Sequence, residues 1–358
     1  MQTPTRAIVD TAALRHNLGR VREFAPGALV MAVVKANAYG HGMEKAVAAL
    51  AEADGFAVAR LEEALALRAA GVRRRILLLE GVLSAAQLAA AAREGLEVMI
   101  HSFEQLRLVE ARPDAGVMRA WLKIDTGMNR LGFRIEEFAE ARQRLQRVSG
   151  VARDPVLATH LANADVVEDP KTAQQLAAFE SATAGLPGER SIANSAGILA
   201  WPAARGDWVR PGLMLYGASP FPGGTGRDLG LRPAMTFQSS VIAIRRVRTG
   251  ETVGYGGDWR AERETVVAVV AAGYGDGYPR SAPSGTPVLV NGYRATLAGR
   301  VSMDMITVDV TGLPDVSVGD PVELWGDALP VEEVARRAGT IPYQLMCAVS
   351  QRVPRETR

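Results

Sequence analysis

The feature that constrains the fold most is a regular alternation of short apolar runs with longer segments of helical spacing. The apolar runs are rich in β-branched residues and recur between residues 29 and 210. Because they are apolar on both faces, they predict buried parallel strands covered by helices. We expect these strands at 29–34, 55–58, 76–79, 96–100, 120–124, 156–159 and 191–194, with an eighth ending near 208–210.

Segments with apolar residues at helical spacing separate these strands. We expect helices at 43–51, 61–70, 85–93, 103–111, 136–145 and 172–182. This alternation is compatible with a closed α/β barrel and with an open, doubly wound sheet, and periodicity alone does not decide between them. The eighth strand, followed by a short helix that Pro211 and Gly212 can open, favours a (β/α)8 barrel of the TIM type.

The pattern changes near residue 231 to strands joined by glycine and proline turns. We expect strands at 235–247, 265–272, 287–290, 294–297, 305–310 and 321–324, and one helix at 331–338. The segment 220–227, PFPGGTGR, has the composition of a linker. We therefore predict an α/β barrel over residues 1–225, whose first few residues can pair with the second domain, and a mostly β C-terminal domain over residues 226–358.

Composition and charge exclude several classes of protein. No apolar run approaches the ~20 residues needed to cross a bilayer, and no N-terminal stretch resembles a signal peptide, so we expect a cytoplasmic protein with no membrane partner. The formal net charge of +2 is spread over 358 residues with both signs interleaved, which argues against nucleic acid. His16, His41 and His101 lack metal-ligand spacing, so we expect no metal. We expect Cys347, the single cysteine, to be a small core residue.

Lysine is rare in this chain, because only four of its 41 basic residues are lysines. Arginine keeps its proton in proteins, whereas a buried lysine can lose it. Lys35 directly follows the apolar run 29–34, and barrel enzymes carry catalytic groups at such strand ends. Desolvation there would lower the pKa of the amine and allow a Schiff base with a carbonyl group.

Other strand ends carry polar side chains that would converge with Lys35 on one barrel mouth: Lys123, Arg130, His160, Asn194 and Ser195. Barrel enzymes often bind phosphate with the loops after strands 7 and 8 and with a short extra helix. Ser195, Gly212 and Leu213 fall at those positions. The barrel mouth therefore combines an amine with a candidate phosphate site.

Eight segments, in order and spanning nearly the whole chain, resemble motifs of bacterial alanine racemases. They are VVKANAYGHG (33–42), LKIDTGMNRLGF (122–133), IANSAG (192–197), WVRPGLMLYG (208–217), VGYGG (253–257), GYGDGYPR (273–280), GRVSMDM (299–305) and IPYQL (341–345). The resemblance implies an α/β barrel followed by a β domain, the cofactor pyridoxal 5′-phosphate (PLP), and a head-to-tail homodimer whose active sites use both chains.

The resemblance also implies the reaction, which interconverts L-alanine and D-alanine through an external aldimine of PLP. Lys35 would be the Schiff-base lysine and one catalytic base, with Tyr255 of the partner chain as the other. Two bases are required because a proton must be removed and returned on opposite faces of a planar carbanion. His160 and Arg210 would stabilise the phenolate of Tyr255 or relay its proton.

Several further roles follow from the same resemblance. Arg210 would face the pyridine nitrogen and, because arginine only donates, would keep that nitrogen unprotonated. Arg130 would reach the phenolic oxygen of the cofactor and the substrate carboxylate, which the backbone N–H of Met303 would also bind. The remaining cofactor contacts would come from Tyr39, His160, Asn194, Ser195, Tyr343 and the backbone of Gly212 and Leu213.

Lys123 resembles a family lysine that is often carbamylated, a change that would place an anion beside Arg130. The alternative is an unmodified Lys123 paired with Asp125. The resemblance further assigns a substrate corridor to the second domain, lined by Tyr274, Arg280 and Arg300.

Two other classes of protein share parts of this pattern. Amino-acid decarboxylases of similar architecture would need a carboxylate at the pyridine nitrogen and a reactive cysteine on the second domain, and this chain has Arg210 and Ser302 there. PLP carrier proteins resemble the barrel alone and would lack Tyr255. The sequence does not choose between supplying D-alanine for peptidoglycan and alanine catabolism, and serine is a candidate minor substrate.

Overall fold

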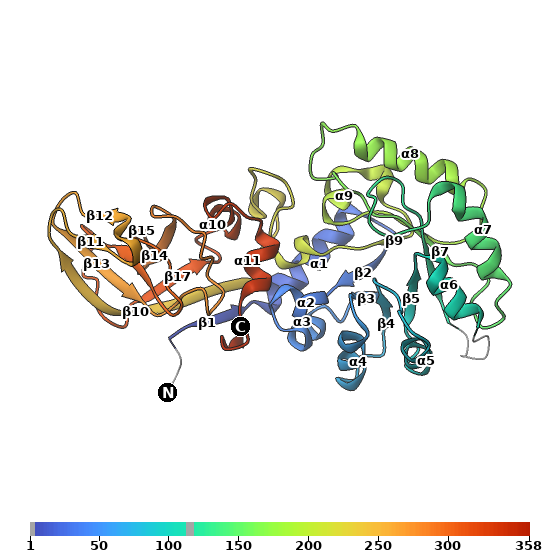
Figure 1. The fold of residues 1–358 in the computed structure, drawn as a ribbon, viewed down its shortest axis with the longest axis horizontal. Helices are drawn as coiled ribbons and strands as arrows, with labels where there is room; N and C mark the ends of the chain where they lie inside the picture. Colours follow the sequence, from blue (N-terminus) through green and yellow to red (C-terminus); the bar gives the residue numbers. More distant parts are fainter. Residues whose placement is uncertain (1–3, 112–117) are drawn as a thin grey trace.

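The computed structural model describes residues 4–111 and 118–358, and in it a barrel lies beside an elongated β-rich part (Figure 1). Eight parallel strands close the barrel, and pairing of the first strand with the last completes the ring. This confirms the TIM-type barrel and excludes the open sheet. The strands are β2 (Leu29–Val33), β3 (Gly55–Val58), β4 (Arg75–Leu78), β5 (Glu97–Ile100), β6 (Ala120–Lys123), β7 (Val156–Ala158), β8 (Arg190–Ser191) and β9 (Trp208–Val209).

Helices cover the outside of the barrel, and the six that we expected there end within two residues of the expected bounds. Ser84 and Ser102 cap two of them by accepting the backbone N–H groups of Gln87 and Gln105. The six are α3 (Met43–Ala49), α4 (Leu61–Ala69), α5 (Ala85–Arg93), α6 (Phe103–Glu110), α7 (Ile135–Gln146) and α8 (Lys171–Thr183).

Four further helices were not predicted. The longest, α1 (Thr11–Phe24), precedes the barrel, and its N-cap is Asp10, whose carboxylate accepts the N–H of Ala13 at 2.8 Å. The other three are too short to show helical periodicity. They are α2 (Lys35–Tyr39), α9 (Ser195–Ala200) and α11 (Pro342–Ala348), with the short 3₁₀ turns η1 (Pro202–Ala204) and η3 (Arg227–Leu229). The short helix expected after Pro211 and Gly212 is present as the 3₁₀ turn η2 (Leu213–Tyr216).

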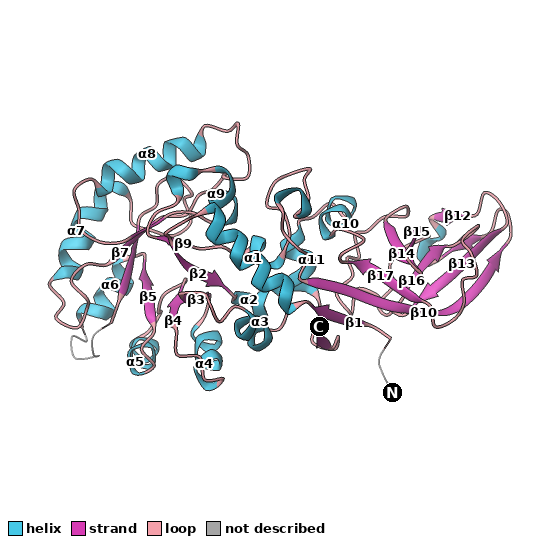
Figure 2. Cartoon of the chain, turned by 180° about the vertical axis from the view of Figure 1, so that it is seen from behind, coloured by secondary structure: helices cyan, strands magenta, loops and turns pink. Residues whose placement is uncertain are grey.

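The β-rich part is built on one eight-stranded sheet, in which the long strand β10 (Met235–Val247) pairs with three neighbours (Figure 2). Both ends of the described chain join this sheet, because β1 pairs with β10 and with β18. Its other strands are β1 (Arg6–Val9), β13 (Thr265–Val270), β14 (Pro287–Val290), β15 (Tyr293–Leu297), β16 (Ile306–Asp309), β17 (Pro321–Trp325) and β18 (Arg355–Thr357). All six strands expected in this region are present. The domain boundary at residue 225 stays a prediction.

Two smaller features complete the β-rich part. The helix α10 (Val331–Arg337) matches the expected one. A two-stranded hairpin of β11 (Thr252–Val253) and β12 (Trp259–Arg260), joined by the turn η4 (Tyr255–Gly257), lies at the end farthest from the barrel (Figure 1). In the described ranges no helix is long and apolar enough to cross a membrane.

Candidate active site

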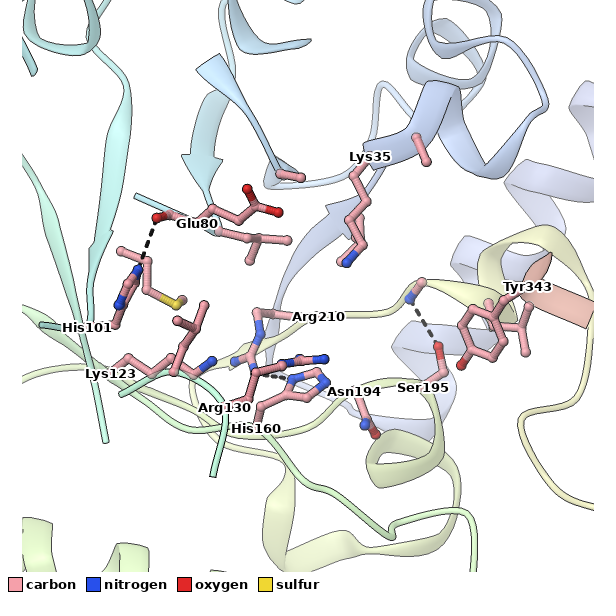
Figure 3. A pocket seen from close by; sticks show the side chains of 18 of the residues that line it. Lys35, Glu80, His101, Lys123, Arg130, His160, Asn194, Ser195, Arg210 and Tyr343 are labelled. Carbon is pink, nitrogen blue, oxygen red and sulfur yellow. Dashed lines mark hydrogen bonds between the residues drawn. The ribbon is translucent and has the colours of Figure 1, made fainter. Parts of the chain in front are cut away.

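A pocket of roughly 700 Å³ opens at the carboxyl ends of the barrel strands, the face where TIM barrels carry active sites (Figure 3). Side chains from most of the strand ends line it, and α11 of the C-terminal part closes one side. The pocket brings together eleven of the residues named from the sequence: Lys35, Tyr39, Lys123, Arg130, His160, Asn194, Ser195, Arg210, Gly212, Leu213 and Tyr343.

Lys123 ends β6 and is only 7% exposed. Burial, reinforced by the charges of Arg210 and Arg130, lowers its pKa from 10.5 to about 8. Asp125 opposes this shift, but its carboxylate is held within its own loop. It accepts the backbone N–H groups of Gly127, Met128, Asn129 and Arg130. The pocket therefore carries excess positive charge, which suits an anionic ligand.

Arg210 follows β9 and is 5% exposed. Its guanidinium donates to Ser191 Oγ at 2.5 Å and to the carbonyl oxygens of Thr159 at 2.6 Å and Ile192 at 3.2 Å. Burial lowers its pKa to about 10, so it stays cationic at neutral pH. These three hydrogen bonds fix the orientation of the Arg210 guanidinium, which lies at the pocket with its positive charge (Figure 3).

His160 lies beside this guanidinium, and its Nδ1 is 3.4 Å from Arg210 Nη2. Because an arginine only donates, Nδ1 accepts and the ring proton is on Nε2. Burial, followed by the charge of Arg210, holds the pKa of His160 well below its usual range. His160 is therefore a neutral imidazole with a defined tautomer.

Hydroxyl groups gather at the side of the pocket nearest α11. Ser195 Oγ accepts the backbone N–H of Gly212 at 3.0 Å, and the rings of Tyr39 and Tyr343 are 5.9 Å apart. A Cβ on Gly212 would lie 2.5 Å from Tyr39 Oη, so only glycine allows this close approach. Asn194 caps α9 through the N–H of Gly197 and holds Ser195 in place. This set of neutral donors, without a carboxylate, suits a phosphate group.

Apart from Tyr343, the predicted residues of the β-rich part lie outside the pocket. Tyr255, on η4, is 69% exposed, and Met303 and Tyr274 are also exposed. Arg300 forms an ion pair with Asp258, next to the turn that carries Tyr255. Arg280 is likewise absent from the pocket lining. One chain by itself does not bring these side chains to Lys35.

Three titratable residues of the pocket were missed from the sequence. Glu80 and His101 follow β4 and β5, so the rule of inspecting strand ends could have found them, and the ring of His101 donates to the carbonyl of Glu80 at 3.1 Å. Cys347 is exposed and lines the pocket four residues after Tyr343 on α11, so the expectation of a core cysteine was wrong. The described residues contain no group of three histidine, cysteine or acidic side chains that could hold a metal ion.

Comparisons with known proteins all point to one family and cover nearly the whole chain. Residues 9–220 match the family model of the alanine racemase N-terminal domain, and residues 234–357 match that of the C-terminal domain. The alanine racemase of Nitrosococcus oceani is 54% identical over 98% of both chains. The catabolic alanine racemase of Pseudomonas putida is 51% identical over 99% of this chain and 98% of its own.

Solved structures extend this agreement to the fold. The biosynthetic alanine racemase of Pseudomonas aeruginosa superposes with a TM-score of 0.97 at 48% identity over both full chains. The alanine racemase of Bartonella henselae, solved with covalently bound pyridoxal phosphate, superposes with a TM-score of 0.91 at 31% identity over both full chains. The chain therefore belongs to the alanine racemase family.

Proposed function

We propose that this chain is an alanine racemase that uses PLP and works as a homodimer with shared active sites. The observation that carries the proposal is the pocket, which places one lysine, Lys35, opposite a buried arginine, Arg210, and beside a set of hydroxyl groups. Both a relative named catabolic and a structure named biosynthetic are close in sequence, so the proposal covers either metabolic role.

The pocket fits PLP in size and in its donors. Lys35 would hold the cofactor covalently, and Tyr39, Ser195 and Tyr343, with the backbone of Gly212 and Leu213, would bind its phosphate. The close approach of Tyr39 Oη to Gly212 supports this cradle, since a side chain there would fill it. Asn194, which caps α9, would support the same phosphate loop, and His160 would pack beside the ring.

Arg210 and Arg130 would bind the other polar edges of the cofactor, Arg210 at the ring nitrogen and Arg130 at the phenolic oxygen. When bound, PLP supplies a carbonyl carbon that takes the substrate amine and a ring that withdraws electrons from its α-carbon. Because the fixed guanidinium of Arg210 only donates, the ring nitrogen would have to accept its hydrogen bond. This arrangement favours return of the proton over side reactions.

Proton transfer needs one group on each face of the substrate. Lys35 Nζ would remove or return the α-proton on one face, and Tyr255 of a second copy of the chain would serve the other. The exposure of Tyr255 supports this, because its phenol is free to enter another molecule. The neutral imidazole of His160, held by Arg210, offers an Nε2–H that can stabilise the phenolate.

The substrate carboxylate would be bound by Arg130 and by the backbone N–H of Met303 from the second copy. Tyr274, Arg280 and Arg300 of that copy would line the corridor through which alanine enters. Both arginines would attract a small carboxylate.

We further propose that Lys123 is carbamylated. Its amine would add to carbon dioxide, forming an N–C bond and releasing one proton, and the product would be an anion beside Arg130 and Arg210. The four backbone bonds already made by Asp125 support this over an ion pair with that carboxylate. Burial is the main cause of the lowered pKa of Lys123, and carbamylation would remove the second cause, the repulsion from Arg210 and Arg130.

The circular dichroism of L-alanine incubated with purified protein and PLP tests the proposal, with L-serine, L-lysine and L-arginine in parallel. The signal of alanine should decay to zero, that of serine should decay slowly if at all, and the other two should persist. The Lys35→Ala variant should leave all four unchanged. Bound PLP without any racemisation would favour a carrier, and release of carbon dioxide would favour a decarboxylase.

A further inference from the structure

The four residues after Lys35 form a left-handed turn. Ala36, Asn37, Ala38 and Tyr39 have φ of 53°, 54°, 55° and 51°, and none of them is glycine. Left-handed backbone is sterically unfavourable for residues that carry a Cβ. A run of four persists only where the surroundings hold it, and such strain is typical of functional sites.

The start and the middle of the turn are held by groups of the barrel. Glu63 Oε1 accepts the N–H of Ala36 at 2.7 Å. The ring of His41 donates from Nδ1 to the carbonyls of Ala38 and Tyr39, both at 3.0 Å. His41 is fully buried, and burial lowers its pKa to about 4, so this donor is a neutral imidazole.

The end of the turn is held from the C-terminal part of the chain. Arg355 Nε donates to the carbonyl of Gly40 at 3.0 Å. The same guanidinium donates to three carbonyls just beyond α11, those of Val349, Ser350 and Val353, at 2.6–2.7 Å. All four partners are backbone oxygens, so this arginine joins two stretches of backbone that are more than 300 residues apart in sequence.

The contact between these stretches is tight. Gly40 has a φ of +81°, and a Cβ there would lie 2.0 Å from the carbonyl oxygen of Met346 in α11. The helix α11 also carries Tyr343, whose ring lies 5.9 Å from that of Tyr39. Two hydroxyl groups of the cofactor pocket therefore come from separate parts of the chain, and their spacing depends on how α11 sits against the turn.

We propose that Arg355 is a positioning residue of the active site, which locks the left-handed turn carrying Lys35 and Tyr39 against α11 and thereby sets the geometry of the cofactor pocket. This inference depends on the proposed PLP site. Arginine is required because its planar fork presents five N–H donors to several oxygens at once, whereas a lysine presents three donors at a single point. Arg355 itself does not touch the pocket.

The test compares Arg355→Lys with Arg358→Lys, a matched control three residues along the chain. Arg358 donates to the carboxylate of Asp10 at 3.0 Å and binds neither the turn nor α11. PLP affinity is measured by titrating each apoprotein with PLP and following quenching of tryptophan fluorescence. Urea unfolding of the same samples reports global stability, and hydrogen exchange reports the amides of residues 36–42.

Arg355→Lys should weaken PLP binding about tenfold or more, equivalent to about 1.4 kcal/mol. It should also speed hydrogen exchange of the amides of residues 36–42 more than that of amides elsewhere in the chain. The pH at which the visible absorbance of bound PLP changes should also shift, since the amine of Lys35 is displaced. Arg358→Lys should do none of these. Affinity within twofold of the original protein, with exchange at 36–42 unchanged, would overturn the inference.

A second measurement uses the unaltered protein and does not depend on the folding of a variant. Addition of PLP to the apoprotein should slow exchange at 36–42 and at 349–355 together, because Arg355 joins the two stretches. Protection confined to 36–42 would contradict the coupling. Absence of any PLP binding by the unaltered protein would instead overturn the proposed function, so the two failures are distinguishable.

Discussion

Lys123 shows how a single buried charge in this pocket can affect the whole protein. Its pKa in the folded state is about 8, below the 10.5 of an exposed lysine. Holding its charged form in the fold therefore costs stability at pH values below 8, and the cost disappears as pH rises from about 8 to 10.5. The pKa difference corresponds to a free energy of the order of 3 kcal/mol.

We expect Lys123→Met to raise the free energy of unfolding of the apoprotein at pH 7. In the unaltered protein this free energy should increase between pH 8 and 10 as Lys123 loses its proton, and in Lys123→Met that increase should be smaller. Urea unfolding in buffers free of carbon dioxide measures both effects. Lys171→Met, at a lysine outside the pocket lining, should keep the original pH dependence. Identical pH slopes for Lys123→Met and the unaltered protein would contradict the burial of a charged Lys123.

Bicarbonate gives a separate prediction about the same residue. If Lys123 is carbamylated, added bicarbonate should stabilise the unaltered protein near pH 8, where about half of the amine is deprotonated and able to react. The same salt concentration as chloride should stabilise it less, and Lys123→Met should not respond to bicarbonate. Equal responses to bicarbonate in both proteins would favour an unmodified lysine.

The close approach of Gly212 to Tyr39 yields another prediction at the residue scale. Gly212→Ala should push the Tyr39 ring away and weaken PLP binding, by about tenfold if one charge-assisted hydrogen bond to phosphate is lost. Tyr39→Phe removes the clashing oxygen, so the double variant should lose less than the sum of the two single losses. Fluorescence titration with PLP measures all three variants, and strict additivity would mean that the two residues do not contact each other.

At the scale of elements, the floor of the barrel opposite the pocket is closed by a buried carboxylate. Glu97, at the start of β5, is 5% exposed and accepts from Arg75 of β4 at 2.5 and 2.9 Å and from the indole of Trp121 in β6 at 2.7 Å. The Arg75 guanidinium also lies 4.2 Å from the ring centroid of Trp208 in β9. Four strands are joined through this cluster, at the barrel face associated with stability.

Glu97→Ala should lower the free energy of unfolding by about 3 kcal/mol, because it leaves a partly buried guanidinium and a buried indole N–H without their acceptor. Urea unfolding measures this loss. The control is Glu104→Ala, which removes an exposed ion pair with Arg107 and should cost less than about 1 kcal/mol. Racemisation at low temperature should survive in both variants, and similar losses of stability would contradict a structural role for the cluster.

At the scale of the whole molecule, the two proposed bases lie far apart in one chain. Lys35 lines the barrel pocket, whereas Tyr255 is on the hairpin turn at the opposite end of the β-rich part (Figure 1). The described structure therefore offers a complete site only if a second copy brings its Tyr255 to this pocket. Closed, two-fold assemblies are the commonest way for a chain to do so.

Mixing two inactive variants tests this assembly. Lys35→Ala and Tyr255→Phe, unfolded and refolded together, should regain up to about a quarter of the normal activity, because half of the dimers are hybrids with one intact site out of two. Each variant refolded alone is the control and should stay inactive. Failure of the mixture to regain activity, with hybrid dimers detected by mass spectrometry, would mean that both bases act within one chain.

Much of the fold could be predicted from the sequence because it depends on local patterns. A strand buried on both faces is a short apolar run, and an outer helix repeats its apolar residues every three or four positions, so the barrel strands and six of its helices were found within a few residues. The same reasoning predicted Lys35, Lys123 and His160 at strand ends, and these line the pocket.

Local patterns do not show what depends on distant contacts. The short helices α9 and α11, and the left-handed turn after Lys35 that makes up α2, have no periodicity of their own and are held by groups elsewhere in the chain. Cys347 lines the pocket only because α11, from the C-terminal part of the chain, packs against α2 at the barrel mouth.

The sequence by itself therefore determined the architecture, the family resemblance and the chemical character of the pocket, since these depend on residue types and their spacing. Only the tertiary structure decided which distant contacts hold the segments that line the pocket in position. The bond between Arg355 and Gly40 joins residues 315 positions apart, and a contact of that range forms only once the sheet has brought β18 beside β1 and α11 against the barrel.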